Sequence, residues 1–257
     1  MKKFFILTFV SLAALSVARA QDYKINKTSG KLEIHLQGVT VEGYDGSEVV
    51  FSSSKAEHDD DPRAKGLRAI SGNGYTDNTG LGISVVENGG TAEVNQVASA
   101  DNDIIIKVPK GVIVSYAWKG VNAGTVLFRN LENEVEISTE YNAVELENVT
   151  GPATVNALYG SVTAKFNDHI KGPISIVAVY AALDVTIPPT TKADVKLESE
   201  HGEILASSDL KIDVAKKADD GMVRYGGTND VEGKLNGGGM EFKLTANYGK
   251  IYLRSGK

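Results

Sequence analysis

The densest group of side chains that could bind a metal ion is the acidic run at residues 57–61, Glu-His-Asp-Asp-Asp. Calcium prefers carboxylate and carbonyl oxygens and takes about six to eight of them. Asp59, Asp60 and Asp61 are therefore candidate calcium ligands. Neither the EF-hand pattern nor the glycine- and aspartate-rich nonapeptide of calcium-binding repeats occurs in the chain. The alternative for this run is a solvated charged loop.

Signatures of common enzymes are missing from the sequence. The chain has no cysteine, which excludes thiolate metal sites and cysteine nucleophiles. Its four histidines share no metal-ligand spacing. There is no G-x-S-x-G motif, no Walker-type phosphate loop and no G-x-G-x-x-G motif. We therefore expect no catalytic residues and no cofactor.

A repeat in the second half of the chain supplies the structural elements on which any binding residues must lie. Five segments share an aromatic residue or histidine followed by a small residue. These anchor residues are Tyr141, Tyr159, Tyr180, His201 and Tyr248. The first four are 18, 21 and 21 residues apart, and the last follows after 47 residues. That gap fits two repeats, or one repeat plus an insertion between Lys211 and Met240.

Apolar residues alternate on both sides of each anchor. In the first repeat they stand at Val135 and Ile137 before it and at Val144 and Leu146 after it. A period of two is typical of β-strands, and its phase shifts across the anchor, which indicates a turn. The residue after the anchor is usually Gly or Asn, so we expect a positive φ there. Ala181 is the exception, and Ala181→Gly should then stabilise the protein.

Repeats of about 20 residues with two short strands each are typical of stacked β-solenoids. The sequence therefore predicts an all-β fold, a single-stranded β-helix or β-solenoid-like stack of short strands, with regular repeats over residues 112–257. A β-sandwich is the alternative, because evenly spaced short strands also suit it. We expect the anchor tyrosines to pack in the core. The alternative is a solvent-facing ladder that stacks on sugar rings.

The first half of the mature chain is also rich in strands. We expect strands at residues 31–36, 39–41, 48–52, 83–86, 91–97, 104–108 and 112–118, with a hairpin-like turn at residues 44–46. No linker rich in proline or serine separates the halves, so residues 21–257 are expected to form one domain.

The N-terminus has the features of a signal peptide. Residues 1–20 contain two lysines, an apolar run and an Ala-Arg-Ala ending that suits signal peptidase. Without the leader's three basic residues, 24 basic residues face 33 acidic ones, a formal net charge near −9. Such a surface repels nucleic acid and anionic lipid, so we expect neither as a partner. The mature protein should be exported to the periplasm, the cell surface or the extracellular space, with no membrane insertion.

Several segments resemble a known family. The Val-Pro-Lys-Gly step at residues 108–111, the turn at 145–152 and the closing strand at 251–254 are similar to bacterial putative adhesins. Residues 42–46 and 66–68 resemble the N-terminal part of the same proteins. The family is a domain of unknown function built from β-strand repeats. The resemblance implies an exported β-solenoid and supplies no catalytic residue.

Three functions fit these features. The first is a non-enzymatic envelope or cell-surface protein, adhesin-like, that binds an unknown glycan or envelope protein. The second is a carbohydrate-active enzyme on a β-helix, although outward carboxylates form no clear cluster. The third is a structural or signalling partner of another envelope protein. We expect contacts in the two insertions, residues 53–66 and 211–240. Arg224 and Tyr225 are the candidate partner-binding residues, since Arg and Tyr are enriched at hot spots.

Overall fold

The structure is a computed structural model that describes residues 22–53, 62–98, 103–121, 124–215 and 229–256. These residues form strands and one short 3-10 helix, η1 (Pro62–Ala64). The strands are β1 (Tyr23–Ile25), β2 (Gly30–His35), β3 (Thr40–Tyr44), β4 (Val49–Ser53), β5 (Ile83–Asn88), β6 (Thr91–Gln96), β7 (Ile104–Pro109), β8 (Val112–Trp118), β9 (Thr125–Arg129), β10 (Val135–Thr139), β11 (Ala143–Val149), β12 (Ala153–Ala157), β13 (Val162–Phe166), β14 (Ile174–Ala178), β15 (Leu183–Ile187), β16 (Ala193–Ser199), β17 (Ile204–Ala206), β18 (Ile212–Val214), β19 (Asn229–Leu235), β20 (Met240–Ala246) and β21 (Ile251–Ser255).

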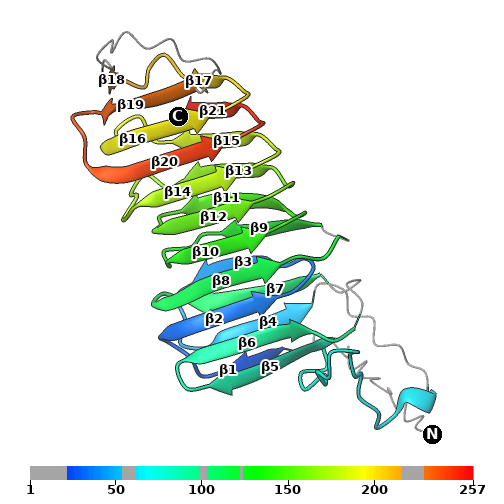
Figure 1. The fold of residues 1–257 in the computed structure, drawn as a ribbon. Coiled ribbons are helices and arrows are strands. Elements are labelled where there is room, and N and C mark those ends of the chain that lie inside the picture. Colours follow the sequence, from blue (N-terminus) through cyan, green and yellow to red (C-terminus); the bar gives the residue numbers. More distant parts are fainter. Residues whose placement is uncertain (1–21, 54–61, 99–102, 122–123, 216–228, 257) are drawn as a thin grey trace, which may run out of the picture.

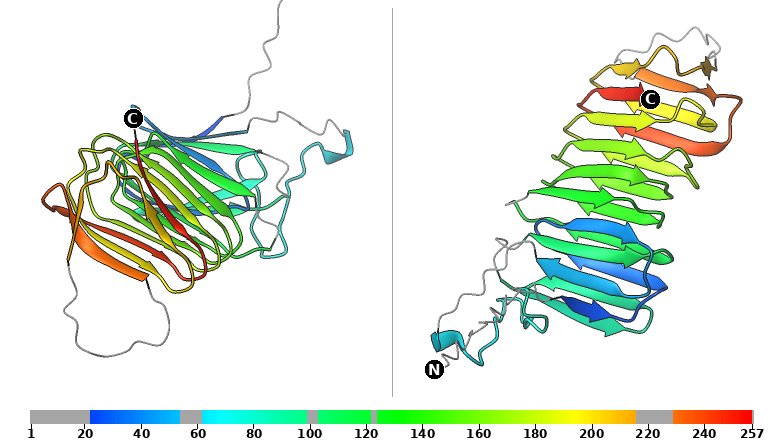
Figure 2. Two further views of the ribbon diagram at one scale, coloured as in Figure 1. Left: turned by 90° about the horizontal axis from the view of Figure 1, so that it is seen from above. Right: turned by 180° about the vertical axis from the view of Figure 1, so that it is seen from behind.

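Two sheets face each other along the whole stack (Figures 1 and 2). The front sheet of Figure 1 runs β18-β19-β16-β20-β14-β12-β10-β8-β2-β6-β5, and the back sheet runs β1-β4-β7-β3-β9-β11-β13-β15-β21-β17. A front strand and the back strand that follows it in the chain make one coil. Among the described residues, eight such coils stack through parallel pairing, as in Val135↔Ala153 and Val144↔Val162. This pairing confirms the all-β solenoid, since sandwiches are built from antiparallel sheets.

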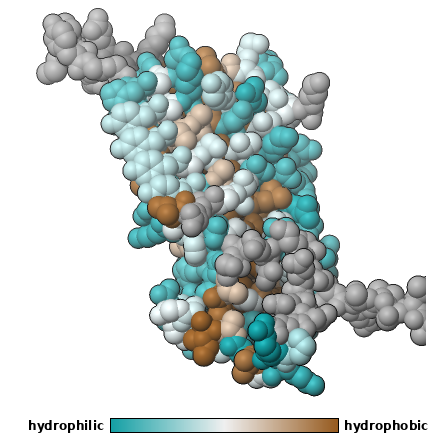
Figure 3. All heavy atoms as spheres, turned by 90° about the vertical axis from the view of Figure 1, so that its right-hand side faces the viewer, coloured by the Kyte–Doolittle hydropathy of each residue, from teal (hydrophilic) through white to brown (hydrophobic). Residues whose placement is uncertain are grey.

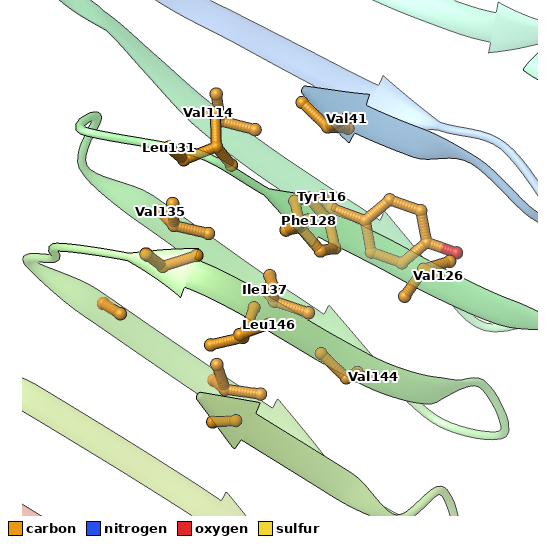
Figure 4. Close-up of a cluster of buried hydrophobic side chains, with 14 of the residues drawn as sticks. Val41, Val114, Tyr116, Val126, Phe128, Leu131, Val135, Ile137, Val144 and Leu146 are labelled. Atoms are coloured by element: carbon orange, nitrogen blue, oxygen red, sulfur yellow. The ribbon is translucent and has the colours of Figure 1, made fainter. Parts of the chain in front are cut away.

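The core lies between the two sheets and follows the alternation in the sequence. In β10 and β11 the side chains of Val135, Ile137, Val144 and Leu146 are buried. The same side chains meet those of neighbouring coils in Figure 4. Each fully buried apolar side chain of this size contributes about 1.5–3 kcal/mol. Because one coil cannot bury its own inward residues alone, every added coil stabilises its neighbours.

The coils do not stack in chain order. Coil β20–β21 lies between coils β14–β15 and β16–β17, although it follows both in the chain. At the other end, coil β2–β3 lies between coils β6–β7 and β8–β9. The 47-residue gap between His201 and Tyr248 is thus one repeat plus an insertion. The repeat that follows the insertion is coil β20–β21, and it takes a place inside the stack rather than at its end.

Antiparallel strands close both sheets at the N-terminal end of the stack and the front sheet at the other end, where the back sheet ends with the parallel strand β17. At the N-terminal end β4 pairs with β7 and β1 with β4, while β5 pairs with β6. At the other end β19 pairs with β16, and β18 with β19. Such caps cover coils whose parallel edge would otherwise invite pairing with another chain. Part of the insertion at residues 211–240 is therefore a cap.

The hairpin expected at residues 44–46 is wrong. Strands β3 and β4 flank this turn, but they do not pair with each other. Strand β7 lies between them, parallel to β3 and antiparallel to β4. The turn residues fit a hairpin locally. The parallel neighbour that β3 requires within the stack decides the pairing instead.

Candidate functional site

Five aromatic rings form a ladder along one edge of the solenoid. They stack in the order Tyr141, Tyr159, Tyr180, Tyr248 and His201, with centroid distances of 5.1, 5.0, 4.9 and 4.8 Å. Neighbouring ring planes are within 20° of parallel. We call these five residues the aromatic ladder. Its spacing follows the separation of about 4.8 Å between adjacent strands.

The aromatic ladder faces solvent, so the expectation that these tyrosines pack in the core is wrong. The exposed fractions are 39% for Tyr141, 49% for Tyr159, 51% for Tyr180 and 53% for Tyr248. Each ring stands in a turn from a front strand to a back strand. Figure 3 shows that edge, and side chains of intermediate hydropathy form a pale column over its upper half.

Buried residues on both sides of the anchor explain why the ring points outward. In the first repeat Thr139 and Asn142 are buried and bonded to each other, Oγ1 to Oδ1, at 2.8 Å. The Asn142 amide also donates to the carbonyls of Gln37 (2.7 Å) and Gly124 (3.1 Å). With both neighbours of the turn facing inward, the ring of Tyr141 has only the outer side left.

The residue after the anchor is small because successive turns almost touch. A Cβ built on Gly160 would lie 1.7 Å from the carbonyl oxygen of Asn142. A Cβ on Gly249 would lie 2.0 Å from the carbonyl oxygen of Ala181. Neither glycine has a positive φ, and Ala181 has none either. The expected positive φ is therefore wrong at these positions, and so is the expected gain from Ala181→Gly.

The stacked geometry limits what the aromatic ladder can bind. Each inner ring has another ring on both faces, so a sugar cannot stack on it. Ring edges and hydroxyl groups remain open along the ladder. A row of this kind offers apolar contact area together with hydrogen-bonding groups, which is typical of tyrosines at protein interfaces.

A polar groove lies at the opposite edge, where back strands lead to the next front strands. It encloses about 540 Å³. Its lining residues are Gly43, Tyr44, Asp45, Lys110, Asn130, Glu132, Asn133, Asn148, Thr150, Asn167, His169 and Lys171. We call this the polar groove. None of these residues was singled out as a site residue from the sequence.

Asparagine side chains link successive coils in the polar groove. The amide of Asn148 donates to Oδ1 of Asn130 at 2.7 Å, and Asn167 donates to Oδ1 of Asn148. Asn130 and Asn148 both have φ of 55°, a conformation that asparagine tolerates better than most residues. These asparagines recur after 18 and 19 residues. That period, close to the anchor spacing, is the signal by which the sequence could have identified them.

Two lysines hold one carboxylate in the polar groove. Lys110 Nζ lies 2.8 Å from Glu132 and 3.0 Å from Asp45. Lys171 contacts the other oxygen of Glu132. Hydrogen bonds from Lys110 and Lys171 lower the pKa of Glu132 to about 2, and the same cluster raises the pKa of Lys110. Two ammonium groups and two carboxylates thus balance each other.

The candidate residues chosen from the sequence lie elsewhere. Asp59, Asp60 and Asp61, as well as Arg224 and Tyr225, fall outside the described residues, and so do residues 1–20. Over the described part of the chain, no three His, Asp or Glu side chains gather in a way that could hold a metal ion. Within the same part, no helix has the length and apolar character needed to cross a bilayer.

Comparison with known proteins gives two distant matches among solved structures. No family model and no curated protein match the chain. A putative cell adhesion protein from Clostridium sporogenes is 13% identical, with a TM-score of 0.44 over 93% of this chain and 100% of that one. A putative adhesin from Bacteroides fragilis is 9% identical, with a TM-score of 0.24 over 93% of this chain and 97% of that one. These matches assign the chain to no family.

Proposed function

We propose that this chain is an exported, non-enzymatic, adhesin-like protein of the cell envelope or surface that binds a partner protein through the aromatic ladder. The observation that carries the proposal is the exposure of four stacked tyrosines on one edge of the stack. Exposed large apolar or aromatic groups that gather in one place mark interaction sites more often than scattered ones do.

The rigidity of the aromatic ladder supports a binding role. Association costs free energy for each side chain that becomes ordered, about 0.5–1.5 kcal/mol for a flexible one. Tyr159 and Tyr180 are each fixed between two other rings, at 5.1 and 5.0 Å and at 5.0 and 4.9 Å. Most of this ordering is therefore already achieved before the partner arrives.

The proposed export depends on residues 1–20, which have the order of a signal peptide: basic start, apolar run and small residues at the end. The cysteine-free sequence is compatible with an oxidising compartment. N-terminal sequencing of the protein from the envelope or the medium should give Gln21 as first residue. A mature chain that retains Met1 in the cytosol would contradict export.

A pull-down from the native envelope tests the partner. Wild-type protein is compared with the double variant Tyr159→Ser/Tyr180→Ser, and Tyr75→Ser serves as control because Tyr75 is an exposed tyrosine outside the ladder. We expect one specific protein with wild type and control and its loss with the double variant, once circular dichroism shows that all three are folded. Retention of the partner by the folded double variant would refute the role of the ladder.

The non-enzymatic part of the proposal has its own test. The purified protein is incubated with a panel of polysaccharides, and reducing ends are measured. We expect no release above a heat-denatured sample. Turnover of any polysaccharide would favour the carbohydrate-active enzyme instead.

A further inference from the structure

We propose that Asn88 is a site of covalent modification, at which the side-chain amide is lost as ammonia through a cyclic imide. This inference is independent of the proposed function, because none of the residues involved belongs to the aromatic ladder. The observation that carries it is a contrast within the chain. Three asparagines are followed by glycine, namely Asn73, Asn88 and Asn236. Of these three described sites, Asn88 alone has both reacting groups free of hydrogen bonds.

The reaction takes place within one dipeptide and needs no partner other than water. The backbone nitrogen of the following residue loses its proton to hydroxide and attacks the side-chain carbonyl carbon, Cγ. A new C–N bond forms, the bond from Cγ to Nδ2 breaks, and the amide nitrogen takes up a proton and leaves as ammonia. Water then opens the imide at either carbonyl, which gives aspartate or isoaspartate. Glycine in the following position leaves the attacking nitrogen without a Cβ beside it.

Both reacting groups are accessible at the turn between β5 and β6. The side chain of Asn88 is exposed, and so are Gly89 and Gly90. In the described structure the amide of Asn88 has no hydrogen-bond partner, and the N–H of Gly89 donates to no acceptor. A Cβ built on Gly89 would meet nothing within 4 Å. Hydroxide can therefore reach this nitrogen, and Cγ can turn toward it without breaking a hydrogen bond.

Hydrogen bonds hold the other two asparagine sites. At Asn73 the attacking nitrogen is engaged, since the N–H of the following glycine donates to the carbonyl oxygen of Ser71 at 2.9 Å. At Asn236 the amide is engaged, because Nδ2 donates to the carbonyl oxygens of Pro189 at 2.8 Å and Thr191 at 2.7 Å. These bonds must open before the ring can close, which should slow the reaction about tenfold. All three sites have the same following residue, so their reactivity in an unfolded chain is matched.

The two products should affect the N-terminal end of the stack differently. The carbonyl oxygen of Gly90 accepts hydrogen bonds from the N–H of Lys31 at 2.9 Å and from the ammonium of Lys27 at 2.6 Å, and it thereby ties the turn to β2 and the residues before it. Isoaspartate continues the main chain through its side chain, so it lengthens the turn by one backbone atom and displaces this carbonyl. Aspartate at position 88 adds a negative charge without lengthening the turn. We therefore expect the isoaspartate form to be the less stable one.

The test uses the full mature chain, incubated at mildly alkaline pH in the folded state and in urea. Peptide mapping by mass spectrometry follows the loss of the amide at each asparagine, and electron-transfer fragmentation separates aspartate from isoaspartate. In urea the three Asn-Gly steps should react at similar rates. In the folded chain we expect Asn88 to keep its rate, whereas Asn73 and Asn236 react about tenfold more slowly.

Reaction at Asn73 or Asn236 as fast as at Asn88 in the folded chain would overturn the inference, and so would an Asn88 that reacts only in urea. The variant Asn88→Gln is the matched control. It keeps an amide at the turn but would have to close a larger ring, so the fast release of ammonia should disappear. Persistence of the fast release would place the reacting amide elsewhere in the chain.

Thermal unfolding tests the structural effect of the modification. The variant Asn88→Asp should melt as wild type does, whereas protein enriched in isoaspartate at position 88 should melt at a lower temperature. Equal melting temperatures for the isoaspartate form and wild type would contradict the role assigned to the Gly90 carbonyl.

Discussion

Gly160 occupies a point where two coils come too close for any side chain. We expect Gly160→Ala to lower the free energy of unfolding by roughly 3 kcal/mol or more, because a Cβ would meet the Asn142 carbonyl oxygen at 1.7 Å. Gly72→Ala is the control, since a Cβ there would meet nothing within 4 Å and no positive φ is involved. It should change stability by less than about 0.5 kcal/mol. Urea unfolding of both variants measures the difference, and equal midpoints would contradict this explanation.

Glu132 should make the protein sensitive to acid. Its pKa in the folded state is lowered to about 2 by hydrogen bonds from Lys110 and Lys171, while an unperturbed carboxyl titrates near 4.5. The stabilisation is therefore fully present above pH 4.5 and is lost as the pH falls toward 2. We expect the stability of Glu132→Gln to depend less on pH across this interval than that of wild type. Urea unfolding at pH 5 and pH 2.5 compares them, and identical pH dependence would contradict the assignment.

Along the aromatic ladder, inner and outer rings should differ in their contribution to stability. Tyr180 stacks on two rings, whereas Tyr141 stacks on one. Because an aromatic pair contributes about 0.5–1.5 kcal/mol beyond its buried area, Tyr180→Ser should cost roughly twice as much as Tyr141→Ser. Thermal unfolding followed by circular dichroism tests this. Equal losses would mean that the stacking itself contributes little and that only local burial matters.

The sequence predicts the register of these elements better than the direction of their side chains. The alternation around Val135 and Val144 identifies the strands, and the anchor spacing puts the tyrosines in line. Whether the line faces inward depends on the turn, where Thr139 and Asn142 take both inward positions. That arrangement depends on hydrogen bonds to Gln37 and Gly124, which come from distant parts of the chain. The polar groove was missed for a related reason, since its lining comes from many separate turns.

At the scale of the whole molecule, the last coil should be indispensable. A chain that stops at Gly239 lacks β20 and β21, which pair with strands on both sides. Four large buried side chains go with them: Phe242, Leu244, Ile251 and Leu253. At about 1.5–3 kcal/mol each, the loss approaches the roughly 5–15 kcal/mol of a typical domain. We expect this chain not to unfold cooperatively.

A chain that lacks residues 21–26 is the control for this truncation. Of the described strands it loses only β1, an edge strand that pairs with β4. Its melting temperature should fall, but the transition should remain cooperative in circular dichroism. If the chain ending at Gly239 also melts in one sharp transition, the coils on either side of the gap must be able to join directly.

The order of the coils could not be derived from the sequence. Coils β16–β17 and β20–β21 carry the same inward alternation, for example Val195 and Leu197 beside Phe242 and Leu244. Nothing in such a pattern says which of them should lie on β14. At both ends the coils depart from chain order, and the alternation of apolar residues, which is alike in all coils, does not encode that departure.

The inserted last coil has a consequence for how the chain folds as it is synthesised. Coil β16–β17 leaves the ribosome before its native neighbour β20–β21 exists. During that interval the free edges of β14 and β15 can pair with the strands of coil β16–β17. A premature stack of this kind must reopen before residues 240–255 can enter. Pairing of β19 with β16 covers one edge of β16 and leaves open the other edge, which pairs with β20 in the native stack. Slow separation of β16 from β14 would therefore delay the last stage of folding. We therefore expect a late step of folding in which the last coil enters between two layers that are already formed, rather than adding to the end of the stack.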